Sequence, residues 1–178
     1  NTTYTKIITG EDLMETAQHG STLYPFQFYY EDLSVFDFNC IEWHWHTELE
    51  FIYIESGTVT LWIGEDQFNL TEGNGIFINT KVLHRLYSPS KALIPNFVFM
   101  PSFIAPCDSL IYQKYILPII SSSLPFLVFH KKVCWQAKVL SIMRQIISAQ
   151  DSVLSKELLT SSLLQNLWLE IFENTDIS

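Results

Sequence analysis

The sequence predicts a mainly β domain followed by a pair of antiparallel α-helices. Short runs rich in aromatic and β-branched residues recur over residues 25–104, and turn-forming residues separate them. Beyond this region, the spacing of apolar residues changes to the three-and-four pattern of a helix. The chain has 178 residues, of which 48% are hydrophobic and 15% aromatic, so it is long enough and apolar enough to bury a core.

The first part of the chain is predicted to form an arm and then strands. Residues 1–24 show no strand pattern and are expected to lead into the β-domain as an N-terminal arm. The predicted strands are PFQFYY, EFIYI, TVTLWI, QFNL, GIFIN and PNFVFM. Turn segments rich in Gly, Pro, Asn and Ser lie between several of them, at residues 55–57, 64–66, 72–75 and 88–90. Such short strands at regular spacing are typical of a sandwich or barrel.

The last part of the chain, residues 105–178, is predicted to be helical. Apolar residues keep helical spacing in residues 133–147 and 155–173, and a shorter helix is expected at Ser109–Leu117, ended by Pro118. Leu169 falls on the polar face of the last helix, and the mean hydropathy of +0.16 is high for a soluble monomer. We therefore expect the helices to pack on the barrel and to form a homodimer interface.

Charge and composition exclude several classes of protein. The 19 acidic and 10 basic residues give a net charge of −9, which disfavours direct binding to nucleic-acid phosphates. The 3 cysteines are widely spaced, as expected for reduced thiols in a cytoplasmic protein. The N-terminal residues lack the apolar core of a signal peptide. The most apolar stretch, Tyr115 to Phe129, is short and contains two prolines, so no membrane span is predicted.

Four residues have the chemistry and spacing of a metal site. His44 and His46 are separated by one residue, so on a strand their side chains point to the same face. Glu50 follows on the next predicted strand, and His84 lies further along the β-region. Imidazoles and a carboxylate that converge on one point are typical ligands for Fe, Mn, Ni, Cu or Zn. The sequence therefore indicates a possible site for a divalent transition metal.

The same residues resemble the motifs of the cupin family. His44-x-His46-x3-Glu50-x6-Gly57 matches the first cupin motif from its first histidine onward. In the second motif Gly73 and His84 are present, whereas Asn79, Lys81 and Ser88 replace its Pro, second Gly and Asn. The resemblance implies a cupin barrel, a jelly-roll-like double-stranded β-helix, over residues 25–104.

Within the cupins, the closest resemblance is to the sensor domain of AraC-type bacterial transcription regulators. The segments that carry it are HWHTELEFIYIESGTVTLWIG and LTEGNGIFINTKVLHRLYSP, and the likeness extends over roughly residues 20–175. It implies a domain that binds a small-molecule effector inside the barrel, dimerises through its C-terminal helices and is not an enzyme. The helix-turn-helix domain through which such a regulator binds DNA is not part of this chain.

Alternatives remain open for the cluster and for the function. The four residues could hold a metal, hydrogen-bond a sugar or another metabolite, or form a satisfied polar cluster. By analogy with sugar-binding family members, Phe28, Tyr30 and Asn96 are further candidate ligand contacts. The main alternative function is a standalone cupin metalloenzyme, of the dioxygenase or isomerase type, that uses the three-His one-Glu site. A carbohydrate-binding or scaffold cupin without metal is a third interpretation.

Overall fold

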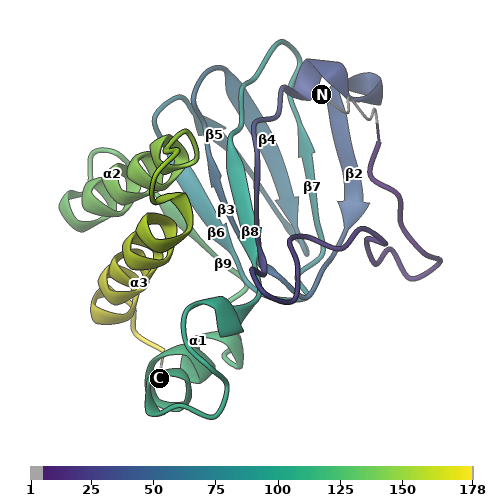
Figure 1. Ribbon diagram of the computed structural model, residues 1–178. Helices are drawn as coiled ribbons and strands as arrows, with labels where there is room; N and C mark the ends of the chain where they lie inside the picture. Colours follow the sequence, from purple (N-terminus) through teal and green to yellow (C-terminus); the bar gives the residue numbers. More distant parts are fainter. Residues whose placement is uncertain (1–5, 178) are drawn as a thin grey trace.

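The computed structural model describes residues 6–177, which form a barrel of two antiparallel sheets with helices packed against one of them (Figure 1). The first sheet has the strand order β1-β8-β3-β6-β9, and the second has the order β2-β7-β4-β5. The strands are β1 (Phe26–Tyr29), β2 (Cys40–His44), β3 (Leu49–Tyr53), β4 (Thr58–Ile63), β5 (Asp66–Thr71), β6 (Gly75–Ile78), β7 (His84–Tyr87), β8 (Asn96–Phe99) and β9 (Phe126–Phe129). This architecture confirms the predicted mainly β class with a cupin barrel.

The five-stranded sheet is buried on both faces. Successive side chains of a strand point to opposite faces, so Phe51 and Phe97 pack toward the helices, whereas Ile52 faces the barrel interior. The helix side is a cluster of aromatic rings, and the barrel side is filled mainly by Ile, Leu and Val. Burial of both faces explains why the runs EFIYI and PNFVFM are almost entirely apolar, with Glu50 and Asn96 as their polar residues, instead of alternating.

Two long helices, α2 (Cys134–Ala149) and α3 (Lys156–Asn174), form the predicted C-terminal pair. Both lie against the helix side of the five-stranded sheet (Figure 1), where the Trp168 ring contacts Phe77 at a centroid distance of 5.8 Å. Leu169 points away from this contact and is 50% exposed, as its position on the polar face predicts. None of the helices in residues 6–177 combines the length and the apolar composition needed to cross a bilayer.

The short helix before this pair differs from its prediction. A π-helical segment (Tyr112–Ile116) continues into α1 (Leu117–Ile120), so the helix passes through Pro118 instead of ending there. In a regular α-helix, Pro118 would lack a hydrogen bond and its ring would clash with the carbonyl four residues earlier. The wider π turn directly before the proline relaxes that conflict.

Strand β9 is not predicted by the sequence analysis. It lies within residues 105–178, for which helices are expected, yet it pairs with β6 and completes the five-stranded sheet. The run FLVF follows Pro125 and is too short to reveal a period, so it cannot be distinguished from part of a buried helix.

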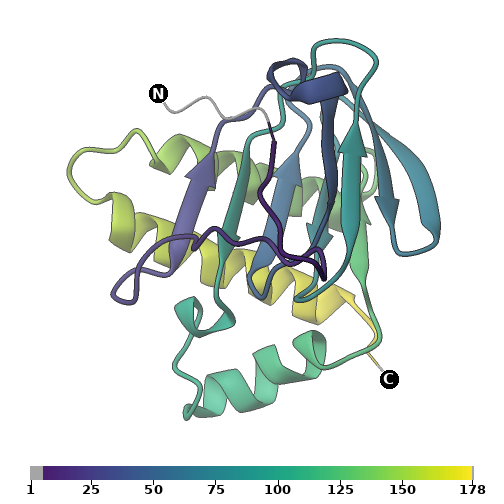
Figure 2. The same cartoon turned by 90° about the vertical axis from the view of Figure 1, so that its right-hand side faces the viewer.

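The N-terminal arm crosses the barrel. Figure 2 shows its dark purple trace running over the strands, and residues 1–5 of the predicted arm lie outside the described residues. Main-chain hydrogen bonds fasten the arm beside the end of β2: Glu15 donates to Trp45 (2.9 Å), and Trp45 donates to Leu13 (3.1 Å). The arm therefore brings its own side chains to the barrel interior.

Short 3₁₀ turns complete the chain at η1 (Leu33–Val35), η2 (Asp37–Asn39) and η3 (Pro101–Phe103).

Lys81 occupies the position of the second Gly in the second cupin motif, and its backbone φ is 61°. This left-handed conformation is the one that glycine adopts without strain. The lysine therefore keeps the backbone path of the motif although its residue type differs, and its N–H donates to the carbonyl of His46 (2.8 Å).

A candidate metal and effector site inside the barrel

An irregularity in β2 places the first histidine. Ile41 pairs with Leu86 and His44 pairs with His84, so β2 uses one more residue than β7 over the same interval. This β-bulge lets Ile41 and His44, three residues apart, both face the barrel interior, which a regular strand does not allow. His46 follows two residues later and returns to the same side, as its spacing predicts.

The four predicted ligand residues converge in the barrel. One ligand atom from each of His44, His46, Glu50 and His84 lies within 4.8 Å of the others, and all four side chains are buried. Nε2 of His46 lies 3.0 Å from Glu50 Oε2, and Nε2 of His84 lies 3.2 Å from the same oxygen. The rings of His44 and His84 are adjacent, with centroids 4.2 Å apart and planes inclined by 54°. The four residues therefore lie together, and the group could hold a metal ion.

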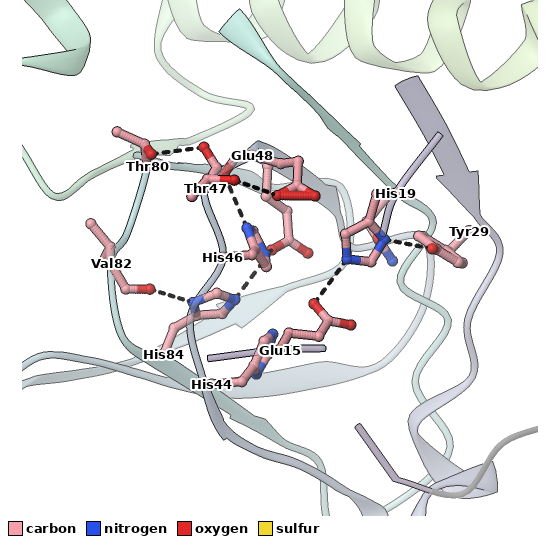
Figure 3. A network of polar contacts seen from close by, with 12 residues as sticks. Glu15, His19, Tyr29, His44, His46, Thr47, Glu48, Thr80, Val82 and His84 are labelled. Carbon is pink, nitrogen blue, oxygen red and sulfur yellow. Dashed lines mark hydrogen bonds and ion pairs between the residues drawn. The ribbon is translucent and has the colours of Figure 1, made fainter. Parts of the chain in front are cut away.

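The outer nitrogens of the three imidazoles are all fixed by the main chain. Each Nδ1–H donates to a carbonyl two residues away: His44 to Glu42 (2.9 Å), His46 to Glu48 (3.0 Å) and His84 to Val82 (2.8 Å); the last is drawn in Figure 3. These bonds orient the rings and leave each Nε2 as the atom that meets its neighbours in the cluster. Metal-bound histidines in proteins use their second nitrogen in the same way.

Burial and mutual contact shift the pKa values of the residues in the cluster. Burial and the neighbouring His84 lower the pKa of His44 to about 3, so this imidazole is neutral. Burial also disfavours the charged form of His46, but the hydrogen bond and charge of Glu50 outweigh it and raise the pKa of His46 to about 9. Burial alone would raise the pKa of Glu50, but its hydrogen bonds with His46 and His84 hold it well below the usual range.

This arrangement fits a divalent metal. Each contact between an imidazole Nε2 and Glu50 Oε2 requires one proton, since both atoms are acceptors without it. A divalent cation bound between these atoms supplies the positive charge in place of the protons, so metal binding releases the protons to solvent. Three imidazole nitrogens and one carboxylate suit Fe, Mn, Ni, Cu or Zn.

Above the cluster lies a cavity of about 30 Å³, enough for an ion with one or two water molecules. Asn96, on β8, lines this cavity together with His44, His46 and Glu50, so one of the three further candidates lies beside the cluster. Its side-chain amide donates to Glu31 Oε1 (2.6 Å) and to the carbonyl of Ile94 (2.9 Å). The structure therefore supplies a second polar wall opposite the histidines.

The other two candidates, Phe28 and Tyr30, lie elsewhere. They line a groove outside the barrel together with residues of α2, while Tyr29 between them lines the cavity. The difference follows from the alternation of side chains along β1, which makes consecutive residues face opposite sides. The analogy with sugar-binding relatives selected the wrong face of this strand for a contact inside the barrel.

The sequence analysis missed the residues that the arm contributes. His19 Nε2 lies 2.9 Å from Glu15 Oε2, and His19 Nδ1 lies 2.6 Å from the Tyr29 hydroxyl (Figure 3). The ring of His19 is 5.8 Å from that of His46 between centroids. Burial would lower the pKa of His19, but the hydrogen bond and charge of Glu15 raise it. Alternation along β1 puts Tyr29 on the face opposite to Phe28 and could have identified Tyr29, whereas the irregular arm carries no periodic signal.

Comparison with known proteins agrees with the fold. The family model of the AraC-like ligand binding domain matches residues 27–168. The uncharacterized HTH-type transcriptional regulator YdeC of Bacillus subtilis is 25% identical over 140 residues, which cover 76% of this chain and 47% of YdeC. The chain thus spans about half the length of this relative.

Solved structures of ToxT from Vibrio cholerae O395 share the fold over most of the chain. The structure bound to (E)-4-(8-methylnaphthalen-1-yl)but-3-enoic acid has a TM-score of 0.54 at 14% identity, covering 86% of this chain and 60% of ToxT. A second ToxT structure has a TM-score of 0.56 at 12% identity, covering 85% of this chain and 56% of ToxT. The match of the family model over most of the chain confirms the resemblance seen in the sequence: this chain belongs to the AraC-like ligand-binding domain family.

Proposed function

We propose that this domain is the effector-sensing part of an AraC-type transcription regulator, and that a divalent transition metal forms the base of its effector site. The observation that carries the proposal is the convergence of three buried imidazole Nε2 atoms and the Glu50 carboxylate, with every Nδ1 held by a carbonyl. His44, His46, Glu50 and His84 would hold the ion. When bound, it supplies a positive charge that can attract an oxygen atom of an effector.

The charge of the cavity favours a cation. Its described lining residues include the carboxylates of Glu15, Glu31 and Glu50, which outnumber the two imidazoles with raised pKa values, His19 and His46, and none of these lining residues is Lys or Arg. Burial, followed by the nearby carboxylates, raises the pKa of the Tyr29 phenol, which reflects a negative potential at this point. A divalent ion entering the cluster gains from this potential, whereas an organic anion alone is repelled.

An organic effector, such as a sugar or another metabolite, requires more room than the cavity of about 30 Å³ offers. Glu15 and His19 of the arm occupy the space next to the cluster, so the arm must move before a larger ligand can enter. Hydroxyl groups of that ligand would then meet Asn96, Glu31 and the metal. Binding shifts the population of arm positions, which is the signal that this domain passes on.

The proposed regulator binds DNA through a helix-turn-helix domain outside this chain. The relative YdeC is named an HTH-type regulator, and the net charge of −9 argues against DNA binding by the sensor domain itself. A cupin metalloenzyme is the second candidate, favoured by the same donor set. It differs in requiring turnover of a substrate at the metal, whereas the sensor requires only binding.

Titration with Co²⁺ tests the metal part of this proposal. Protein freed of metal should bind one Co²⁺ per chain and develop the visible absorption of a low-symmetry Co²⁺ site with nitrogen and oxygen ligands. Absence of binding at millimolar Co²⁺ would refute the metal part of the proposal, and the site would then bind only an organic effector. The sensing part is tested separately, by comparing the DNA affinity of the full regulator with and without the ion.

Dimerisation through the helical hairpin belongs to the same proposal. Four large aliphatic side chains at the turn between α2 and α3 are exposed: Val153, Leu154, Leu158 and Leu159. Beside them is a groove of about 470 Å³ that includes Ala149, Leu159 and Leu163. Because a protruding apolar turn adjoins an open groove on one surface, two copies related by a twofold axis can each insert the turn into the groove of the other.

We expect Leu154→Ser to raise the dissociation constant of the dimer at least about 100-fold, since two buried leucines, one per copy, are lost. Sedimentation equilibrium measures this change. Leu23→Ser is the matched control, because Leu23 is 98% exposed on the arm, compared with 96% for Leu154, and lies outside the hairpin. Equal association of the two variants would contradict this interface.

A further inference from the structure

We propose that the groove between β1, β3 and α2 is a second ligand site, and that it takes a short peptide-like zwitterion. This outer groove is lined by Phe28, Tyr30, Tyr53, Glu55, Arg144, Ile147, Ser148 and Asp151, and its volume is about 660 Å³. Ligand sites of proteins have volumes of about 300–1,000 Å³. The groove shares no lining residue with the barrel cavity, so this inference does not depend on the proposed metal and effector site. It shares Ser148 and Asp151 with the groove beside the helical hairpin.

Three aromatic rings form one wall of the outer groove. The rings of Phe28 and Tyr30 meet edge to face with centroids 6.5 Å apart, and Tyr53 lies near the end of β3 on the same side of the sheet. Tyr30 is 55% exposed although its ring is large and mostly apolar. The exposed ring of Tyr30 beside the partly exposed ring of Phe28 offers an apolar body a surface to bind.

Arg144 gives the outer groove an unused charge. Its guanidinium lies over the Tyr53 ring, 5.6 Å from the centroid, and Nη1 donates to the Tyr53 hydroxyl at 3.4 Å. Among the described residues, Arg144 forms no ion pair, although a guanidinium has five N–H donors. Its remaining donors are available for a carboxylate, which guanidinium binds in a bidentate way.

A second arginine in this chain shows what Arg144 lacks. Arg85 also stacks on an aromatic ring, 4.5 Å from the centroid of Trp62, and its Nε donates to Glu42 Oε2 at 3.1 Å. Arg85 therefore has both an aromatic and an acidic partner, whereas Arg144 has only the aromatic one. A ligand carboxylate would complete the equivalent set at Arg144.

Asp151 supplies a negative charge about one short peptide length away from Arg144. Arg144, Ser148 and Asp151 succeed one another along one side of α2 and its end, and seven residues of a helix rise about 10 Å. An extended chain of two or three residues spans about 7–10 Å. With its carboxylate on Arg144, such a chain brings its ammonium group toward Asp151. Glu55, which accepts a hydrogen bond from the Tyr30 hydroxyl, adds a second carboxylate to the groove.

Trileucine and two capped derivatives test the assignment in calorimetric titrations. The zwitterionic tripeptide should bind, and both the N-acetylated form, which lacks the ammonium, and the C-terminal amide, which lacks the carboxylate, should bind at least about tenfold more weakly. Equal affinities for the three peptides, or no binding of trileucine at millimolar concentration, would overturn the proposal.

Arg144→Gln locates the carboxylate. This change should reduce the affinity for trileucine at least about tenfold and remove the difference between the free acid and the amide. Lys138→Gln is the control, because Lys138 is also a cation on α2 but pairs with Glu170 outside the groove. Unchanged binding by Arg144→Gln would place the peptide elsewhere. As a second readout, the Nε–H resonance of Arg144 should shift on addition of the acid but not of the amide.

Discussion

Replacing His84 with alanine is expected to weaken Co²⁺ binding at least about 100-fold. Loss of hydrogen-bond partners around a metal ligand already costs about 10–100-fold in affinity, and loss of the ligand itself costs more. His84 is fully buried, its Nε2 lies 3.2 Å from Glu50, and its Nδ1 is held by Val82. The other three residues of the metal-ligand group are ligands themselves, so none of them can supply the donor atom that is lost with His84.

The matched control for this experiment is His130→Ala. His130 is an exposed histidine next to β9 and lies outside the metal-ligand group, so its loss should leave Co²⁺ affinity unchanged. Circular dichroism verifies that both variants are folded before the titration. If His84→Ala binds Co²⁺ as tightly as the unaltered protein, the ion occupies a different site and the four-residue assignment is wrong.

The second large effect is expected in the aromatic core between sheet and helices. Phe51 is fully buried at the centre of this core, and its ring lies 5.0 Å from Phe77, 5.4 Å from Phe97 and 6.0 Å from Phe99 between centroids. Phe51→Ala should lower the free energy of unfolding by about 3–5 kcal/mol, through lost burial and the cavity left behind. Denaturation in urea measures the change.

Phe38→Ala provides the comparison with the same side chain removed from the surface. Phe38 is 93% exposed, so its replacement should change the free energy of unfolding by no more than about 0.5 kcal/mol. Similar effects of the two substitutions would mean that Phe51 is not enclosed by the rings and helices around it.

Much of the barrel could be predicted because its signals are local. His44 ends β2, Glu50 lies on β3 and His46 lies in the short connection between these strands, so the motif carries both a local piece of the fold and the cluster. The helix pair was also predictable, since long amphipathic segments show their period clearly. The bulge in β2 was not, because nothing in the sequence signals that β2 has one more residue than β7 between the pairs Ile41–Leu86 and His44–His84.

The remaining differences come from contacts that the chain makes over long distances. The face of β1 that meets the cavity depends on its pairing with β8, which puts Tyr29 opposite Asn96 and turns Phe28 the other way. Glu15 and His19 reach the cavity only because the arm is fastened to Trp45. Strand β9 is a strand because β6 offers it an edge. None of these partners can be identified from the residues on either side.

The two buried faces of the five-stranded sheet have a consequence for how variation in this protein is inherited. Along β3, Glu50 and Ile52 belong to the barrel interior, whereas Phe51 and Tyr53 belong to the side of the helices. Neighbouring codons of the gene thus specify side chains with different surroundings, one lining the barrel cavity and the next packing on the side of the helices. Mutations in every second codon can therefore change the lining of the cavity while the codons between them keep the contact between sheet and helices intact.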